Sequence, residues 1–396
     1  MAGSVVLSGA RTPMGKLGGA LAPLSPVELG AAVIAEALRR AGVPPGAVGQ
    51  VLMGQVLQAG QGQNPARQAA VRAGVPMDVP AMTLNKVCLS GLSALHLADL
   101  MIAAGEADVV VAGGMESMSQ APHLVAGLRP GLRYGDAALV DVIASDGLYC
   151  AFDGIVMGAA TDRDAAAAGV GRQEQDAFAA RSHELAAAAT KSGRLAEETV
   201  PVSVPGRRGE AVEVSQDEGI RPETSIEKLA ALRPAFSEGG TITAGNASQI
   251  SDGAAALVVA SREASRRLGA EPLAEVVSYG QVAGPDTNLL TQPSRAIDAA
   301  LARAGLSVGD LEVIEVNEAF AAVVVASARD LGVPVEAHRP MFNPNGGAIA
   351  LGHPLGMSGA RLALTLAYEL HNRGGLGAAG LCGGGGQGDA VVLRAL

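Results

Sequence analysis

The feature that most constrains the fold is an internal repeat. The stretch ALRRAGVPPGAVGQV (37–51) has a counterpart in ALARAGLSVGDLEVI (300–314), with Ala, Leu, Arg, Ala, Gly and Gly recurring in step. Each copy is typical of a helix with small and apolar residues on one face, followed by a glycine stop and a short strand. We therefore expect the 396 residues to form one large duplicated unit.

The two halves also end alike. An apolar segment (89–102) precedes ADVVVAGG in the first half, and a similar segment (361–370) precedes GAAGLCGGGG in the second. Both segments are apolar on nearly all sides, as expected for helices buried between layers. Strands that alternate with such helices predict an α/β fold with mainly parallel sheets covered on both faces.

The pattern changes between residues 119 and 240, where charged helices and a Pro/Arg/Glu-rich stretch replace the apolar segments. We interpret 119–240 as an inserted loop domain. The first half would then be 1–118, completed by about 241–268, and the second half 269–396. The amphipathic helix over 173–191 is expected to be a surface helix, with partner binding as the alternative.

Composition excludes several classes of protein. The net charge of −10 argues against binding to nucleic acid, although Arg207, Arg208, Arg221, Lys228 and Arg233 could form a local cluster for a small anion. No apolar run approaches the roughly 18 residues of a membrane helix. The N-terminus lacks the regions of a signal peptide, so we expect a cytoplasmic protein with free thiols and no membrane contact.

Two cysteines at glycine-rich turns carry the chemical signal: Cys88 in NKVCLSG and Cys382 in LCGGGGQG. Asn317 in NEAF and His353 in GHPLG add a carboxamide and an imidazole. One Cys with a His suffices for acyl transfer to water or an amine, whereas a second thiol is needed if another proton must move. The set therefore indicates carbon–carbon bond chemistry on a thioester.

Cys88 also has a structural interpretation, and two other features of the sequence are expected to carry no function. Cys88 at the start of a helix is expected to form a thiolate readily, but it could also be a buried cysteine that packs as a small apolar residue. Cys150 has no glycine context and is interpreted as a bystander. GLGAAG (375–380) matches a dinucleotide fingerprint but precedes a strand, so no nicotinamide site is expected.

At these residues the chain resembles the thiolase family, and within it the acetoacetyl-CoA thiolases (acetyl-CoA acetyltransferases). The resemblance runs nearly end to end through GARTPMGKLGG, NKVCLSG, VAGGMESMSQAPH, GTITAGNASQISDGAAA, NEAFA, NPNGGAIALGHPLGMSGAR and CGGGGQGDA. It implies the thiolase fold, a duplicated five-layered αβαβα sandwich with an inserted loop domain that binds CoA.

The resemblance also implies roles. Cys88 would carry the acetyl group of one acetyl-CoA, and Cys382 would remove the α-proton of the second. His353 would activate Cys88 and, with a water held by Asn317, stabilise the enolate oxygen. The backbone N–H groups of Cys88 and Gly384 would form a second oxyanion hole.

The substrate-binding residues implied by the resemblance line a CoA channel: Leu148, Met157, Arg221, Lys228, Phe236, Ala244, Ser248, Ala319 and Phe320. Val156 replaces a His of many acetoacetyl-CoA thiolases, which removes a polar contact to pantetheine. Acetyl-CoA, acetoacetyl-CoA and CoA are the expected substrates and products, with no cofactor or metal, in a homo-oligomer built as a dimer of dimers.

Other functions are alternatives. A 3-ketoacyl-CoA thiolase of broader chain length is the alternative within the family. A ketoacyl synthase would pair its Cys with His residues and would not need Cys382. A cysteine hydrolase would leave Cys382 idle, and an acyl-CoA-binding relative without turnover would be expected to have lost a catalytic Cys or His.

Overall fold

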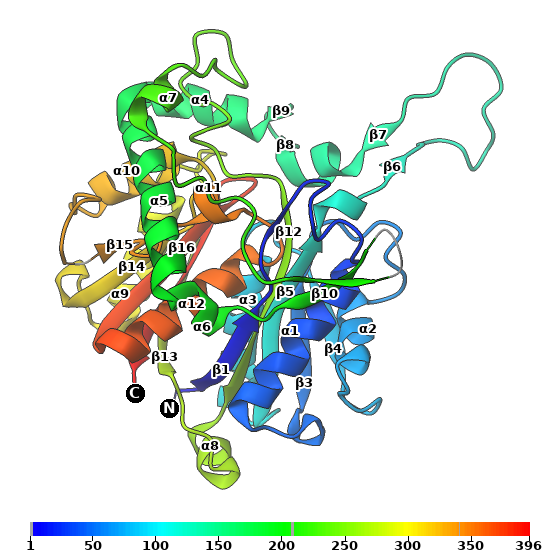
Figure 1. The fold of residues 1–396 in the computed structure, drawn as a ribbon, viewed down its shortest axis with the longest axis vertical. Helices are drawn as coiled ribbons and strands as arrows, with labels where there is room; N and C mark the ends of the chain where they lie inside the picture. Colours follow the sequence, from blue (N-terminus) through cyan, green and yellow to red (C-terminus); the bar gives the residue numbers. More distant parts are fainter. Residues whose placement is uncertain (1–2, 207–209, 340) are drawn as a thin grey trace.

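The computed structural model describes residues 3–206, 210–339 and 341–396 (Figure 1). Arg207 and Arg208, two members of the predicted cationic cluster, lie outside the described residues. Among the described helices, none is both long and apolar enough to span a lipid bilayer.

The main sheet is built twice from the same order of strands. The first half orders its strands β4-β3-β5-β12-β1 and the second half β15-β14-β16-β17-β13, so each half places its strands in the order third, second, fourth, fifth, first. The first set is β1 (Val5–Arg11), β3 (Gln50–Gly54), β4 (Ala81–Leu84), β5 (Val109–Ser117) and β12 (Ser251–Ala260). The second set is β13 (Ala274–Ala283), β14 (Leu311–Val316), β15 (Met341–Phe342), β16 (Leu376–Gly383) and β17 (Gln387–Ala395). The predicted duplication is confirmed.

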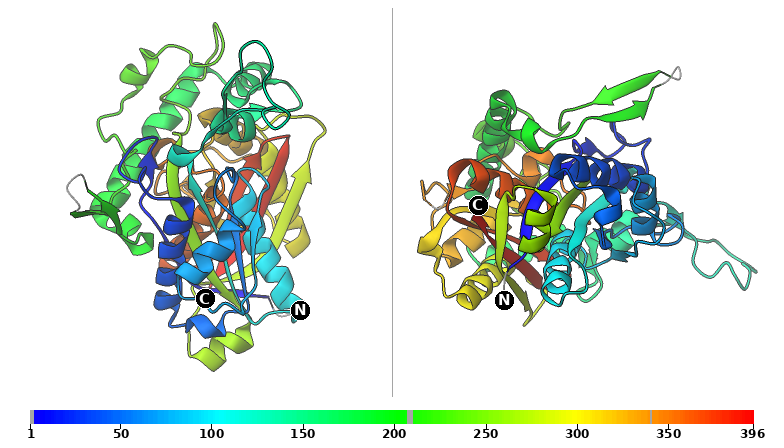
Figure 2. Two further views of the ribbon diagram at one scale, coloured as in Figure 1. Left: turned by 90° about the vertical axis from the view of Figure 1, so that its right-hand side faces the viewer. Right: turned by 90° about the horizontal axis from the view of Figure 1, so that it is seen from below.

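Helices complete the layers. One pair covers the outer face of the first half, a second pair covers the outer face of the second half, and a third lies between the halves (Figure 1, Figure 2). These pairs are, in that order, α1 (Pro26–Ala41) with α2 (Pro65–Arg72), α9 (Gln292–Ala304) with α10 (Ala321–Asp330), and α3 (Ser90–Ala103) with α12 (Ser358–Arg373). The five-layered αβαβα arrangement follows.

The glycine stops predicted for the repeat are present. Gly42 ends α1 with φ 64°, and Gly305 ends α9 with φ 66°, the left-handed conformation that glycine adopts without a Cβ penalty. A strand follows each stop, as the repeat predicted.

The expectation of mainly parallel sheets is wrong. β3 pairs in parallel with β4 and β5, but β12 is antiparallel to both β5 and β1. The second half repeats this mixture. The cause in the second half is the glycine turn after β16, which is too short for a helical crossover and so returns the chain as an antiparallel neighbour.

The insert follows β5. Its elements are β6 (His123–Leu124), β7 (Val140–Asp141), β8 (Tyr149–Cys150), β9 (Ile155–Val156), α4 (Met157–Ala167), α5 (Arg172–Ser192), α6 (Arg194–Glu198), β10 (Val202–Pro205), β11 (Ala211–Val214) and α7 (Ile226–Ala230). Of these, β6 to β9, α4 and α7 form the upper part of the molecule, whereas α6 and β10 lie lower, beside the body (Figure 1). Three short elements lie elsewhere: β2 (Gly15–Lys16), α8 (Arg262–Leu268) and α11 (Ala348–Leu351). The exact limits of the inserted domain, 119–240, remain a prediction from the sequence.

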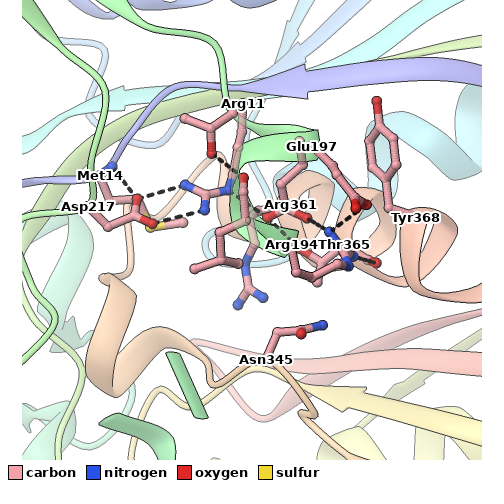
Figure 3. A network of polar contacts seen from close by, with 12 residues as sticks. Arg11, Met14, Arg194, Glu197, Asp217, Asn345, Arg361, Thr365 and Tyr368 are labelled. Atoms are coloured by element: carbon pink, nitrogen blue, oxygen red, sulfur yellow. Dashed lines mark hydrogen bonds and ion pairs between the residues drawn. The ribbon is translucent and has the colours of Figure 1, made fainter. Parts of the chain in front are cut away.

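A buried ionic network joins the insert to the duplicated body (Figure 3). Arg11 on β1 is fully buried; it donates to Glu198 at 2.7 Å and to both oxygens of Asp217 at 2.7 and 2.9 Å. Arg194 donates to Glu369 on α12 at 3.1 Å. Since each carboxylate is buried with its cation, loss of one partner would leave an uncompensated charge in the core.

Candidate active site

Four side chains from separate parts of the chain meet between the two halves. Cys88 precedes α3, Asn317 follows β14, His353 follows α11, and Cys382 lies in β16. All four are buried. Cys88, His353 and Cys382 line one cavity of about 50 Å³, and the Nδ2 atom of Asn317 lies 3.5 Å from Nε2 of His353. The sequence predicted this set, and the fold brings it together.

The thiol of Cys88 faces the imidazole of His353, with 3.3 Å between Sγ and Nε2. Burial raises the pKa of Cys88 to about 12, and the backbone N–H groups of Cys88 and Gly384 only partly oppose this rise. The expected thiolate at a helix start is therefore wrong for the resting protein: loss of water outweighs the helix dipole. Ionisation of Cys88 needs a proton acceptor, and His353 is within reach.

Hydrogen bonds fix the tautomer of His353. Ser358 Oγ donates to the carbonyl of Pro354 at 2.8 Å, so its one hydrogen is used there. The same oxygen lies 2.6 Å from Nδ1 of His353 and accepts from Nδ1–H. The lone pair of Nε2 is then left to face Cys88. Burial, followed by the charge of Arg361, lowers the pKa of His353 to about 4, so the resting imidazole is neutral.

The backbone just before Cys88 is strained. Val87 has φ 52°, a left-handed conformation that costs a β-branched residue on the order of 1–3 kcal/mol. Asn85 Oδ1 accepts from the Val87 N–H at 3.0 Å, and Ser90 Oγ donates to the Val87 carbonyl at 2.6 Å. These bonds hold the turn that presents the sulfur of Cys88 to the cavity.

Cys382 reaches the same cavity from the other half. Burial, and then the nearby Cys88, raise the pKa of its thiol, so Cys382 is protonated in the resting state. The glycine turn that follows has positive φ at Gly385 and Gly386, and a Cβ on Gly386 would lie 1.9 Å from the carbonyl of Asp286. Any side chain is therefore excluded at Gly386.

Asn317 has an unused acceptor. Its Oδ1 atom is buried, and no hydrogen-bond donor reaches it among the described residues. A buried carbonyl of this kind needs a donor from water or substrate. This geometry suits the water-holding role that the resemblance implies.

The residues expected to bind substrate divide into two groups. A second cavity of about 290 Å³ adjoins the inner one and shares Leu148, Met157, Ser248 and Phe320 with it. Phe236 lines only the second cavity, and Ala319 only the inner one. Ala244, Arg221 and Lys228 are exposed and line neither cavity.

Sequence reasoning missed several residues that shape the site. Leu355 lines both cavities, and Ile143 and Ile250 line the outer one. Glu116 is fully buried and accepts backbone N–H bonds from Val56, Leu57 and Gly356, which clamps the turn that follows His353. Leu355 and Ser358 follow His353 by two and five residues within the motif GHPLGMSG. This closeness in the sequence was the signal that could have identified them.

The fold and the site define an acyltransferase of duplicated α/β architecture, with two cysteines in one buried cavity. Two family models match the chain: the thiolase N-terminal domain over residues 4–263 and the thiolase C-terminal domain over residues 270–395. The chain belongs to the thiolase family.

Individual relatives match the chain over nearly its full length. A probable acetyl-CoA acetyltransferase of Mycobacterium leprae is 57% identical, with 100% of both chains covered. An acetyl-CoA acetyltransferase of Chromobacterium violaceum is 48% identical, with 98% of each covered. The crystal structure of the Bacillus anthracis acetyl-CoA acetyltransferase superposes with a TM-score of 0.96 at 38% identity and covers 100% of this chain and 99% of that one.

Proposed function

We propose that this chain is an acetyl-CoA acetyltransferase, which converts two acetyl-CoA molecules into acetoacetyl-CoA and CoA and also runs the reverse cleavage. The observation that carries the proposal is that two thiols, Cys88 and Cys382, share one small cavity with the imidazole of His353. A hydrolase needs only one of these thiols, whereas a Claisen condensation needs a nucleophile and a separate base. The names of the full-length relatives support the same assignment.

In the first half-reaction, Cys88 passes its proton to Nε2 of His353 and attacks the thioester carbonyl of acetyl-CoA. The carbon–sulfur bond to CoA breaks, and the departing CoA thiolate takes the proton of Cys382. The products are acetyl-Cys88, CoA, a Cys382 thiolate and an imidazolium. The raised pKa of Cys382 keeps its thiol protonated until this step and makes its thiolate a stronger base for the second half-reaction.

In the second half-reaction, the Cys382 thiolate removes an α-proton from the second acetyl-CoA. The carbanion attacks the carbonyl of acetyl-Cys88, and the Cys88 thiolate leaves and recovers its proton from His353. All protons balance. Before it returns that proton, Nε2–H donates to the enolate oxygen together with a water held by Asn317. Such a donor contributes typically about a hundred- to thousandfold in rate.

The N–H groups of Cys88 and Gly384 form the second oxyanion hole, which receives the carbonyl oxygen of the acetyl-Cys88 thioester. Both groups face the Cys88 sulfur, as their effect on its pKa indicates. The pantetheine arm of CoA lies along the 290 Å³ cavity, and Arg221 and Lys228 contact the nucleotide phosphates beyond it. The outer cavity is mostly apolar in its lining, in keeping with a pantetheine chain.

We also propose a homo-oligomer, a dimer of dimers, in the cytoplasm. The hairpin formed by β6 and β7 projects far from the body (Figure 1, Figure 2). It exposes Leu128, Leu132, Tyr134 and Leu139, which is unusual for a monomer surface. Strand β4 ends the described sheet, and an exposed edge of this kind pairs readily with another chain. Light scattering that gives a monomer at micromolar concentration would refute the oligomer.

The test of the activity is cleavage of acetoacetyl-CoA by the purified chain in the presence of CoA. Incubation with acetyl-CoA should place one acetyl group on Cys88, detected by mass spectrometry of the peptide. An acetyl group on Cys382 or Cys150 would reverse the assignment of the nucleophile. Hydrolysis of acetyl-CoA without any acetoacetyl-CoA would favour the hydrolase instead.

A further inference from the structure

Two charged residues of the active-site motifs have no role in the proposed reaction. Lys86 belongs to NKVCLSG, and Asp389 belongs to CGGGGQGDA. Their side chains form an ion pair between the two halves, with 2.7 Å from Nζ to Oδ1. Asp389 is fully buried, and the side chain of Lys86 is 26% exposed.

The carboxylate of Asp389 is surrounded by hydrogen-bond donors. Ser93 Oγ donates to Oδ2 at 2.9 Å, and the hydroxyl of Tyr279 donates to the same oxygen at 2.7 Å. With Lys86 on Oδ1, all three partners are donors. A buried, acceptor-only group of this kind depends on its cation, and Lys86 is the cation in direct contact with it.

The ion pair joins the two turns that supply the second oxyanion hole. Lys86 stands two residues before Cys88, in the turn strained at Val87. Asp389 lies on β17 opposite Leu381 of β16, just past the glycine turn that holds Gly384. The turns also lie next to each other, because a Cβ added at Gly384 would be 3.5 Å from Cγ1 of Val87.

Local bonds alone do not set the distance between these turns. The hydrogen bonds from Asn85 and Ser90 shape the Cys88 turn from within the first half. Ser93 and Tyr279 also reach Asp389, but they come from α3 and β13 and not from the Cys88 turn. Lys86 is the member of the cluster that lies in the turn itself.

We propose that Lys86 and Asp389 are positioning residues whose ion pair sets the spacing between the N–H groups of Cys88 and Gly384. This inference rests on the proposed function and deepens it. The pair does not touch substrate. It acts on the acetylation of Cys88, where the carbonyl oxygen must reach both N–H groups at once, and leaves α-proton removal by Cys382 largely unaffected.

The experiment separates these two partial reactions. Rapid mixing with acetyl-CoA, followed by acid quench and mass spectrometry, gives the rate of Cys88 acetylation. Exchange of acetyl-CoA α-protons with D₂O, measured on protein that has been acetylated to completion at Cys88 beforehand, reports on Cys382. For Lys86→Met we expect acetylation to slow by about 10- to 100-fold, the loss typical of a misplaced oxyanion donor. Exchange should change by less than about threefold, because its donors are elsewhere.

Two further variants complete the design. Lys86→Arg keeps the ion pair and should retain most of the acetylation rate, and it serves as the test if Lys86→Met does not fold. Tyr279→Phe is the matched control: it removes a buried donor from the same carboxylate, so thermal stability should fall while acetylation stays near the native rate.

Equal losses in acetylation and exchange, or native acetylation in a folded Lys86→Met, would overturn the positioning role. The same holds if Tyr279→Phe slows acetylation as much as Lys86→Met does. Failure of the native protein to acetylate Cys88 at all would instead refute the proposed function, so the two failures are distinguishable.

Discussion

Replacement of Ser358 by Ala tests whether the tautomer of His353 controls the nucleophile. Ser358 Oγ lies 2.6 Å from Nδ1 of His353 and is the partner that favours hydrogen on that nitrogen. In Ser358→Ala the buried Nδ1–H has no acceptor, which disfavours this tautomer by about 1–3 kcal/mol. At about 1.4 kcal/mol for each factor of ten, acetylation of Cys88 should slow by about five- to 150-fold.

The assay is rapid-quench acetylation of Cys88 by acetyl-CoA, followed by mass spectrometry. Thr365→Ala is the control, because Thr365 lies on the same helix, is buried, and donates to Glu198 at 3.1 Å without touching His353. That control should lose stability and keep its rate of acetylation. If Ser358→Ala acetylates Cys88 within a factor of about two of the native rate, the tautomer argument is wrong.

Four other outcomes are expected. Because the pKa of His353 is lowered to about 4, the imidazole is a neutral base above that pH and becomes protonated below it. In a pH series, the rate of Cys88 acetylation should therefore fall as the pH drops through about 4, with no inflection near the ordinary histidine value of 6.5. Cys382→Ser should still become acetylated at Cys88 yet lose condensation by several orders of magnitude, because a hydroxyl is a far poorer base; survival of condensation with loss of acetylation would show that the roles are exchanged. The 50 Å³ inner cavity and Met157 leave little room for a longer tail, so acetoacetyl-CoA should be cleaved at least about tenfold more efficiently than 3-ketohexanoyl-CoA, and comparable kcat/KM values would favour the broader 3-ketoacyl-CoA thiolase. Arg11→Met leaves the buried carboxylate of Asp217 without its cation and Glu198 with Arg194 alone, and should lower the free energy of unfolding by about 3–5 kcal/mol in urea titrations; a loss near zero would contradict the buried network.

The sequence by itself determined the duplication and the nature of the buried helices, and it predicted the four side chains that the fold brings together. The repeat at 37–51 and 300–314 shows in the sequence because helix periodicity and glycine stops are local properties of the chain. Cys88, Asn317, His353 and Cys382 were recognisable for a related reason: each lies in a short motif whose glycines and prolines fix a turn.

Tertiary structure decided what depends on burial and on contacts between distant segments. In the second half the antiparallel pairing arises because β17 returns through a glycine turn, which helix and strand patterns do not specify. The pKa of Cys88 rises to about 12, opposite to the expectation from its helix start, because the closed cavity removes water from the thiol. The role of Ser358 and the ion pair of Lys86 with Asp389 likewise depend on which side chains meet when the two halves enclose α3 and α12. Distances between the halves are set by packing, and a linear motif carries no such distance.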